Sequence, residues 1–169
     1  MSRIRLAAAG LVALALLAPA HAASIAAGDA APPVRLPDRS GQVVSLAALR
    51  GQPVVVDFWA SWCAVCRTAL PALDALARRR AGDGVRVLAV NVDRSRAAAD
   101  AWLAARLPSP AVTVLLDPEG ATLARFGADG MPALYVVDRD GVVRLALSGA
   151  ALERLDAVER VLDALAPAP

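Results

Sequence analysis

The sequence predicts an α/β fold in which a central mixed β-sheet is flanked by helices. Three observations carry this prediction: β-branched runs alternate with helical patterns, the run "PVVVDFWA" is apolar almost without a break, and the chain closes on a hairpin followed by an amphipathic helix. With 169 residues and 57% hydrophobic content, the chain is long enough for one domain with a full core.

The first 22 residues have the pattern of a secretory signal peptide. Arg3 and Arg5 precede an uncharged apolar run over residues 6–18, and the small-x-small ending at 20–22 predicts cleavage after Ala22. The apolar run is shorter than the roughly 20 residues that span a bilayer. We therefore expect a secreted protein, and the alternative is a membrane tether formed by an uncleaved N-terminus.

The remaining elements follow one another in a regular order. Residues 23–33 are rich in proline and alanine and predict an extended leader, and residues 166–169 predict a frayed tail. Residues 34–165 form the expected domain. Its expected elements are two short strands about a turn at 38–41, a helical turn at 47–50, a strand at 53–60, a helix at 63–80, a strand at 85–93, a helix at 97–106, a strand at 112–117, a hairpin at 133–149 and a helix at 152–165.

The charged residues narrow the functions that the chain can have. All 18 basic residues are arginine, and without the two in the signal peptide the chain has 16 basic and 16 acidic side chains. A net charge of zero argues against a nucleic-acid partner. The single histidine, His21, lies in the signal peptide, so the mature protein has no imidazole for acid–base chemistry or metal binding.

The two cysteines, Cys63 and Cys66, lie three positions apart in "FWASWCAVCRTALP". A structural metal is disfavoured because two cysteines supply half of the usual four ligands. A purely structural disulfide is also weak, since closing so short a loop stabilises the fold by only about 2 kcal/mol. Cys63 falls where a buried strand ends and a helix begins, and a helix N-terminus lowers a thiol pKa. The pair therefore predicts a thiol-disulfide centre.

The run "VVVDFWASWCAVC" resembles the active-site signature of the thioredoxin superfamily, and within it the secreted TlpA/ResA-like thiol-disulfide oxidoreductases. Pro71 is similar to that family's kink proline, and "GMPALYVVDRDG" to its cis-proline loop, which makes Pro132 the expected cis-proline. Residues 93–130 hold an extra helix and strand, as in the TlpA/ResA-like branch. The resemblance covers about residues 34–165 and implies a thioredoxin-like fold with this insert and an N-terminal β-hairpin.

The resemblance also implies three catalytic residues. Cys63 would attack a substrate disulfide and Cys66 would resolve the mixed disulfide. Asp57 matches thioredoxin's buried aspartate, but Ala89 stands where thioredoxin has a lysine, so we expect a raised pKa and a role as acceptor of the Cys66 proton. The alternative is an aspartate hydrogen-bonded to hydroxyls or water near the strand end. Val65 replaces the proline that the family most often has between its cysteines.

Five further residues are expected around the cysteines. Trp62 and Met131 would form an apolar rim that contacts substrate. The backbone of Met131, beside Pro132, would pair with an extended substrate strand. Trp59 and Pro71 would support the wall of the site from the core and from the helix.

Three classes of function stay open. The leading one is a monomeric, periplasmic disulfide reductase that serves cytochrome c maturation or copper-site assembly. It would take electrons from a membrane thiol-disulfide donor and need no cofactor beyond the Cys63–Cys66 disulfide. An oxidant or isomerase is the second, because the dipeptide between the cysteines is not diagnostic. The third is a redox-inert binding module. A peroxiredoxin is disfavoured because neither cysteine lies in a PxxxTxxC context.

Overall fold

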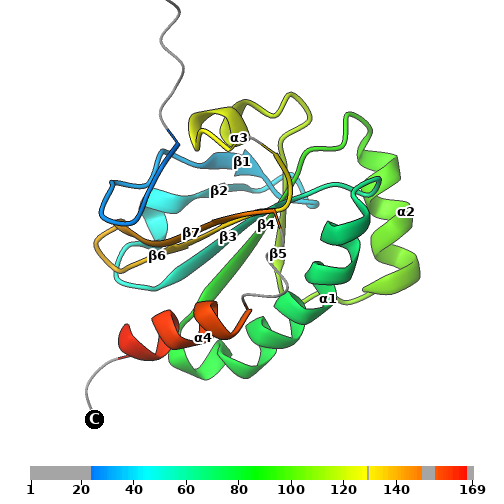
Figure 1. Ribbon diagram of the computed structural model, residues 1–169. Helices are drawn as coiled ribbons and strands as arrows, with labels where there is room; N and C mark the ends of the chain where they lie inside the picture. Colours follow the sequence, from blue (N-terminus) through cyan, green and yellow to red (C-terminus); the bar gives the residue numbers. More distant parts are fainter. Residues whose placement is uncertain (1–23, 129, 150–154, 167–169) are drawn as a thin grey trace, which may run out of the picture.

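A computed structural model describes residues 24–128, 130–149 and 155–166 (Figure 1). Five strands form one mixed sheet, and two more form a separate antiparallel pair. The predicted mixed sheet with flanking helices is confirmed. The elements are β1 (Arg35–Pro37), β2 (Val43–Ser45), a 3-10 helix (Leu46–Leu49), β3 (Val54–Trp59), α1 (Ala64–Arg79), a 3-10 turn (Ala81–Asp83), β4 (Arg86–Asn91), α2 (Arg96–Arg106), β5 (Thr113–Leu116), α3 (Ala121–Arg125), β6 (Ala133–Val137), β7 (Val143–Ser148) and α4 (Leu155–Ala164).

Strand β3 lies at the centre of the sheet, whose order is β5-β4-β3-β6-β7. It runs parallel to β4 and antiparallel to β6, and all six of its residues are buried. Three consecutive valines suit such a strand, because β-branched side chains pack well on a pleated surface that is covered on both faces. The carboxyl end of β3 leads directly into the loop that carries the cysteines.

Helices cover one face of the sheet, and the N-terminal elements cover the other. Helices α1 and α4 lie against the first face, and α2 joins the same core through Ala99 and Leu103 (Figure 1). The opposite face packs against Val34, Leu46 and Phe126, which come from the N-terminal segment and the end of α3. The core is therefore divided by the sheet into two layers.

The segments before and directly after β1 cover the two outer edges of the sheet. Ala30 bridges to Val142 beside β7, and the backbone N–H of Val143 donates to the Asp29 carbonyl at 2.8 Å. Further along, Asp38 bridges to Leu115 of β5 at the opposite edge. The leader expected over residues 23–33 is thus extended only in part, since it also turns at residues 27–28.

The expected insert over residues 93–130 is present and holds one more helix than the sequence suggests. Helix α2 and strand β5 follow β4 as predicted, and a short helix, α3, follows a turn at residues 118–119. Asp117 explains the extra helix, because its carboxylate accepts the Thr122 N–H at 2.9 Å and the Ala121 N–H at 3.2 Å. These bonds satisfy free donors at a helix start.

Three predictions fall wholly or partly on residues that the structure does not describe. The signal peptide, residues 1–22, lies outside the described residues, as do residues 152–154 of the last expected helix and residues 167–169 of the expected tail. Among the helices that the structure describes, none is long and apolar enough to cross a bilayer.

Candidate active site

The two cysteines form a disulfide at the start of α1, with their Cα atoms 5.3 Å apart. Cys63 is the N-cap residue of the helix, and its sulfur accepts the backbone N–H of Cys66 at 3.2 Å. Cys63 is 9% exposed, whereas Cys66 is fully buried. A thiol or disulfide approaching from solvent therefore meets the Cys63 sulfur first. This asymmetry matches the attacking and resolving roles that the sequence predicts.

A buried aspartate fixes the loop that precedes the disulfide. Asp93, just beyond β4, accepts the Ser61 N–H and the Ser61 hydroxyl, both at 2.9 Å. The Asn91 side chain donates to the same carboxylate at 2.8 Å. Because Ser61 lies two residues before Cys63, these bonds set the position of the helix start and of the disulfide.

Asp57 lies on β3 among apolar residues of the layer that contains α1. Its neighbours across the sheet are Ala89 on β4 and Leu134 on β6, both in the core cluster that also holds the cysteines. Asp57 is fully buried, and neither carboxyl oxygen has a hydrogen-bond partner in the described part of the chain. Burial raises the pKa of Asp57 well above its usual value. Among the described residues, no hydroxyl group bonds to this carboxyl group.

Trp59 forms the wall behind the disulfide. It is fully buried in the same cluster as the cysteines, and its ring packs against the ring of Trp102 on α2 with centroids 5.3 Å apart. Its indole Nε1 finds no hydrogen-bond partner among the described residues. Trp59 is thus a core residue, as expected, and it ties the insert to the site.

The rim of the site is apolar and partly open to solvent. Trp62 is 68% exposed and Val65, inside the CxxC dipeptide, is 47% exposed. Met131 is half-buried and packs against the cluster that contains both cysteines. The Met131–Pro132 peptide bond is cis, as predicted, and the Pro132 carbonyl accepts the Gly149 N–H at 2.9 Å.

Pro71 lies within α1 on its exposed side, between the buried positions Leu70 and Leu73. It lines a surface groove together with Ala64, the residue that follows Cys63. In the part of the chain that the structure describes, no group of three or more His, Cys, Asp or Glu side chains could hold a metal ion.

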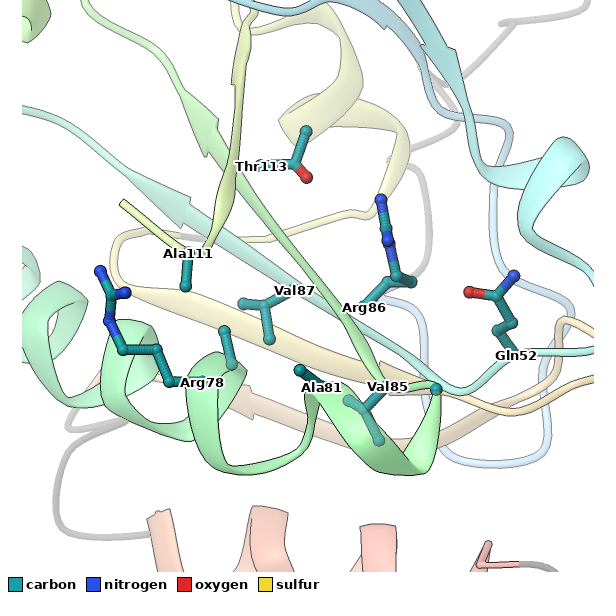
Figure 2. Close-up of a pocket in the computed structure, with 10 residues that line it drawn as sticks. Gln52, Arg78, Ala81, Val85, Arg86, Val87, Ala111 and Thr113 are labelled. Atoms are coloured by element: carbon teal, nitrogen blue, oxygen red, sulfur yellow. The ribbon is translucent and has the colours of Figure 1, made fainter. Parts of the chain in front are cut away.

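A separate cavity of about 570 Å³ lies away from the disulfide, at the far end of α1 and the starts of β4 and β5 (Figure 2). Arg78 and Arg86 reach its walls, with Val87 between them. Arg78 is already engaged, because its guanidinium donates to Asp74 at 3.0 Å and to the Ser109 carbonyl at 2.5 Å. None of the predicted site residues lines this cavity, so it is not the site of thiol chemistry.

Sequence reasoning missed the polar anchor and one rim residue. Ser61 and Asp93 follow the carboxyl ends of two adjacent parallel strands, a position that brings loops together, and this signal could have found them. In the sequence, Val65 is notable only because it replaces the proline that the family most often has between its cysteines. Its exposure beside Trp62 makes it part of the apolar rim.

A thioredoxin-like sheet whose first long helix begins at a CxxC disulfide defines the class of thiol-disulfide oxidoreductases, and this chain is a member of that class. More particularly, the chain belongs to the AhpC/TSA family, whose model matches residues 27–146. The thioredoxin-like resemblance is thereby confirmed.

Named relatives agree with this class. The thiol:disulfide interchange protein DsbE of Pseudomonas fluorescens biotype C is 34% identical over 129 residues, covering 76% of this chain and 70% of that protein. The thiol-disulfide oxidoreductase ResA of Geobacillus kaustophilus is 26% identical, covering 85% of this chain and 80% of that protein. A crystal structure described as a thiol:disulfide interchange protein DsbE from Chlorobium tepidum is 37% identical, with a TM-score of 0.77 over 84% of this chain and 99% of that one.

Proposed function

We propose that this oxidoreductase reduces disulfides of protein substrates in the bacterial periplasm, in cytochrome c maturation or copper-site assembly. The direction of electron transfer, from the protein to its substrate, is inferred from how few hydrogen bonds the Cys63 sulfur accepts. Within the described residues, its one hydrogen-bond donor is the Cys66 N–H. Strongly oxidising dithiols owe their potential to a stabilised reduced form. Apart from the helix start, a Cys63 thiolate has this single backbone donor, which favours a reducing dithiol over a strongly oxidising one.

The reaction requires two successive sulfur exchanges. The Cys63 thiolate attacks one sulfur of the substrate disulfide, forming a mixed disulfide and expelling the other sulfur as a thiolate. The Cys66 thiol then loses its proton and attacks the Cys63 sulfur, which releases the second substrate sulfur. The substrate gains two electrons, and the protein is left with the Cys63–Cys66 disulfide that the structure contains.

Asp57 is the proposed acceptor of the Cys66 proton. Because burial raises its pKa, the Asp57 carboxylate binds a proton more strongly than an ordinary aspartate. Its position on β3, in the same apolar layer as Cys66, keeps the exchange away from bulk water. Trp62, Val65 and Met131 supply apolar contacts to the substrate around the outer sulfur.

The remaining proposals concern partners and location. No cofactor is needed besides the disulfide, which a membrane thiol-disulfide donor would return to the dithiol state in a monomeric protein. The periplasmic location rests on the sequence pattern of residues 1–22, and the relatives named DsbE and ResA support the proposed pathway.

Equilibration against glutathione redox buffers tests the direction. We expect a reduction potential near that of thioredoxin, about −270 mV. A potential close to the strongly oxidising value of about −120 mV would favour the oxidant or isomerase instead. Failure of the disulfide to exchange with any thiol would indicate the redox-inert binding module.

A further inference from the structure

A groove of about 450 Å³ lies between α1 and α2, beside the disulfide. On α1, its wall is a stripe of residues spaced three and four apart, which places them on one face of the helix. On α2, two residues four apart face that stripe, and the two helices lie next to each other in Figure 1. The lining residues are Ala64, Arg67, Thr68, Pro71, Trp102 and Arg106.

The groove begins at the reacting sulfur. Ala64 directly follows Cys63 in the chain, and it is exposed at the head of the groove. Trp102 is half-buried, with its ring resting on Trp59 of the wall behind the disulfide. A chain segment covalently joined to Cys63 would therefore reach the groove within a few residues of the linked cysteine.

Two uncompensated cations line this groove. Arg67 and Arg106 are exposed, and within the described residues neither guanidinium forms an ion pair or a side-chain hydrogen bond. By contrast, seven other arginines form ion pairs with carboxylates. No acidic residue lines the groove. The nearest acid on α2, Asp100, is already paired with Arg39 and Arg96 at 2.7 and 3.0 Å. The positive charge is therefore free to act on a partner.

We propose that the groove between α1 and α2 binds an acidic segment of the disulfide substrate, adjacent to the cysteine that Cys63 attacks. Arg67 and Arg106 each pair with a carboxylate, for which the guanidinium fork is well suited. The exposed part of the Trp102 ring packs against the aliphatic part of the segment. This assignment rests on the proposed function, since it names the class of substrate that the same site prefers.

The test compares disulfide peptides that differ only in charge near the cysteine. Three peptides carry two aspartates, two asparagines or two lysines next to the reactive cysteine, and the reduced protein converts each under single-turnover conditions. We expect the second-order rate constant for the acidic peptide to exceed that for the neutral one about fivefold at low salt. The preference should shrink as the salt concentration rises, because the groove is exposed.

Variants separate the groove from the reaction itself. In the double variant Arg67→Gln and Arg106→Gln, the acidic and neutral peptides should react at equal rates, with the neutral rate unchanged. The matched control is Arg86→Gln, which removes an exposed and unpaired arginine at the opposite end of the sheet and should keep the fivefold preference.

The possible outcomes count against different claims. An acidic preference that survives in the double variant, or none in the wild type, overturns the groove assignment while leaving the reductase intact. No reaction with the neutral peptide, in a protein whose disulfide exchanges with glutathione, overturns the reductase proposal instead. Preference for the lysine peptide would refute the charge argument directly.

Discussion

Replacing Asp57 with asparagine should make the protein more stable at neutral pH and slower as a reductase. Asp57→Asn keeps the size of the side chain but removes an ionisable carboxyl group that is fully buried with no partner in the described residues. An amide is easier to bury than an unpaired carboxylate. The stabilising effect of the substitution should therefore depend on pH, because the aspartate side chain can ionise and the asparagine side chain cannot.

The sign follows from the raised pKa of Asp57 in the folded protein. Below about pH 4, the carboxyl is protonated in both the folded and the unfolded chain, so wild type and variant should differ little. Above that pH, the unfolded chain releases its proton and the folded protein does not. The free energy of unfolding of the wild type should then fall, relative to Asp57→Asn, by up to about 1.4 kcal/mol for each pH unit until Asp57 ionises in the folded state.

Urea denaturation of the oxidised proteins from pH 4 to pH 8 measures this difference. Asp138→Asn provides a control of opposite sign. Burial alone would raise the pKa of Asp138, but the N–H groups of Val142 and Asp140 and the Arg144 guanidinium outweigh it and lower the pKa. That variant should be less stable than the wild type above about pH 4. Parallel stability curves for Asp57→Asn and the wild type would refute the argument from burial.

The same Asp57→Asn variant should lose reductase turnover by about 100-fold, the usual contribution of a positioned base. Stopped-flow measurement of the resolution step isolates this effect from binding of the substrate. Turnover equal to that of the wild type from pH 6 to 8 would assign proton transfer to bulk water and leave Asp57 with a structural role.

Three other results are expected. Iodoacetamide at mildly acidic pH should label Cys63 of the reduced protein before Cys66, because the Cys63 sulfur is the more exposed one and lies at a helix N-terminus. If mass spectrometry shows the reverse order of labelling, the roles of the two cysteines are exchanged. The Cys66→Ser variant should accumulate mixed disulfides with protein substrates, since the resolving thiol is gone. Non-reducing gels that show no such adducts would contradict the two-step scheme. Asp93→Ala should lower the free energy of unfolding by about 2 kcal/mol or more, because the hydrogen-bond donors of Ser61 and Asn91 lose their acceptor. An unchanged denaturation midpoint would show that the Asp93 carboxylate is dispensable for stability.

The strands and the site on β3 could be predicted because their signals are local. Three valines in a row describe a strand that is buried on both faces, and a cysteine directly after such a strand falls at a helix start. The register that places Ala89 beside Asp57 was also accessible, since it follows from the thioredoxin-like resemblance. In each case the chemistry depends on neighbours in sequence or on a motif with a fixed geometry.

What the sequence could not reveal depends on how distant segments meet. Arg67 and Arg106 are 39 positions apart, and nothing in either local pattern indicates that they share a groove. Asp93 lies between an apolar strand and a charged stretch, and its bonds to Ser61 arise only once β3 and β4 pair. The missing partner of Asp57 is likewise a property of the packed interior.

The way residues 24–38 reach both outer strands has a consequence for a thiol-disulfide oxidoreductase that meets unfolded polypeptides. Open strand edges are templates on which unfolded polypeptides align and aggregate. Here Ala30 occupies the margin beside β7 and Asp38 the margin beside β5, so a client chain meets backbone that is already engaged at both places. Cutting the chain before Val34 should therefore open the margin beside β7, while Asp38 stays in place beside β5. The shortened protein should coprecipitate with unfolded polypeptides, although every reactive group would remain.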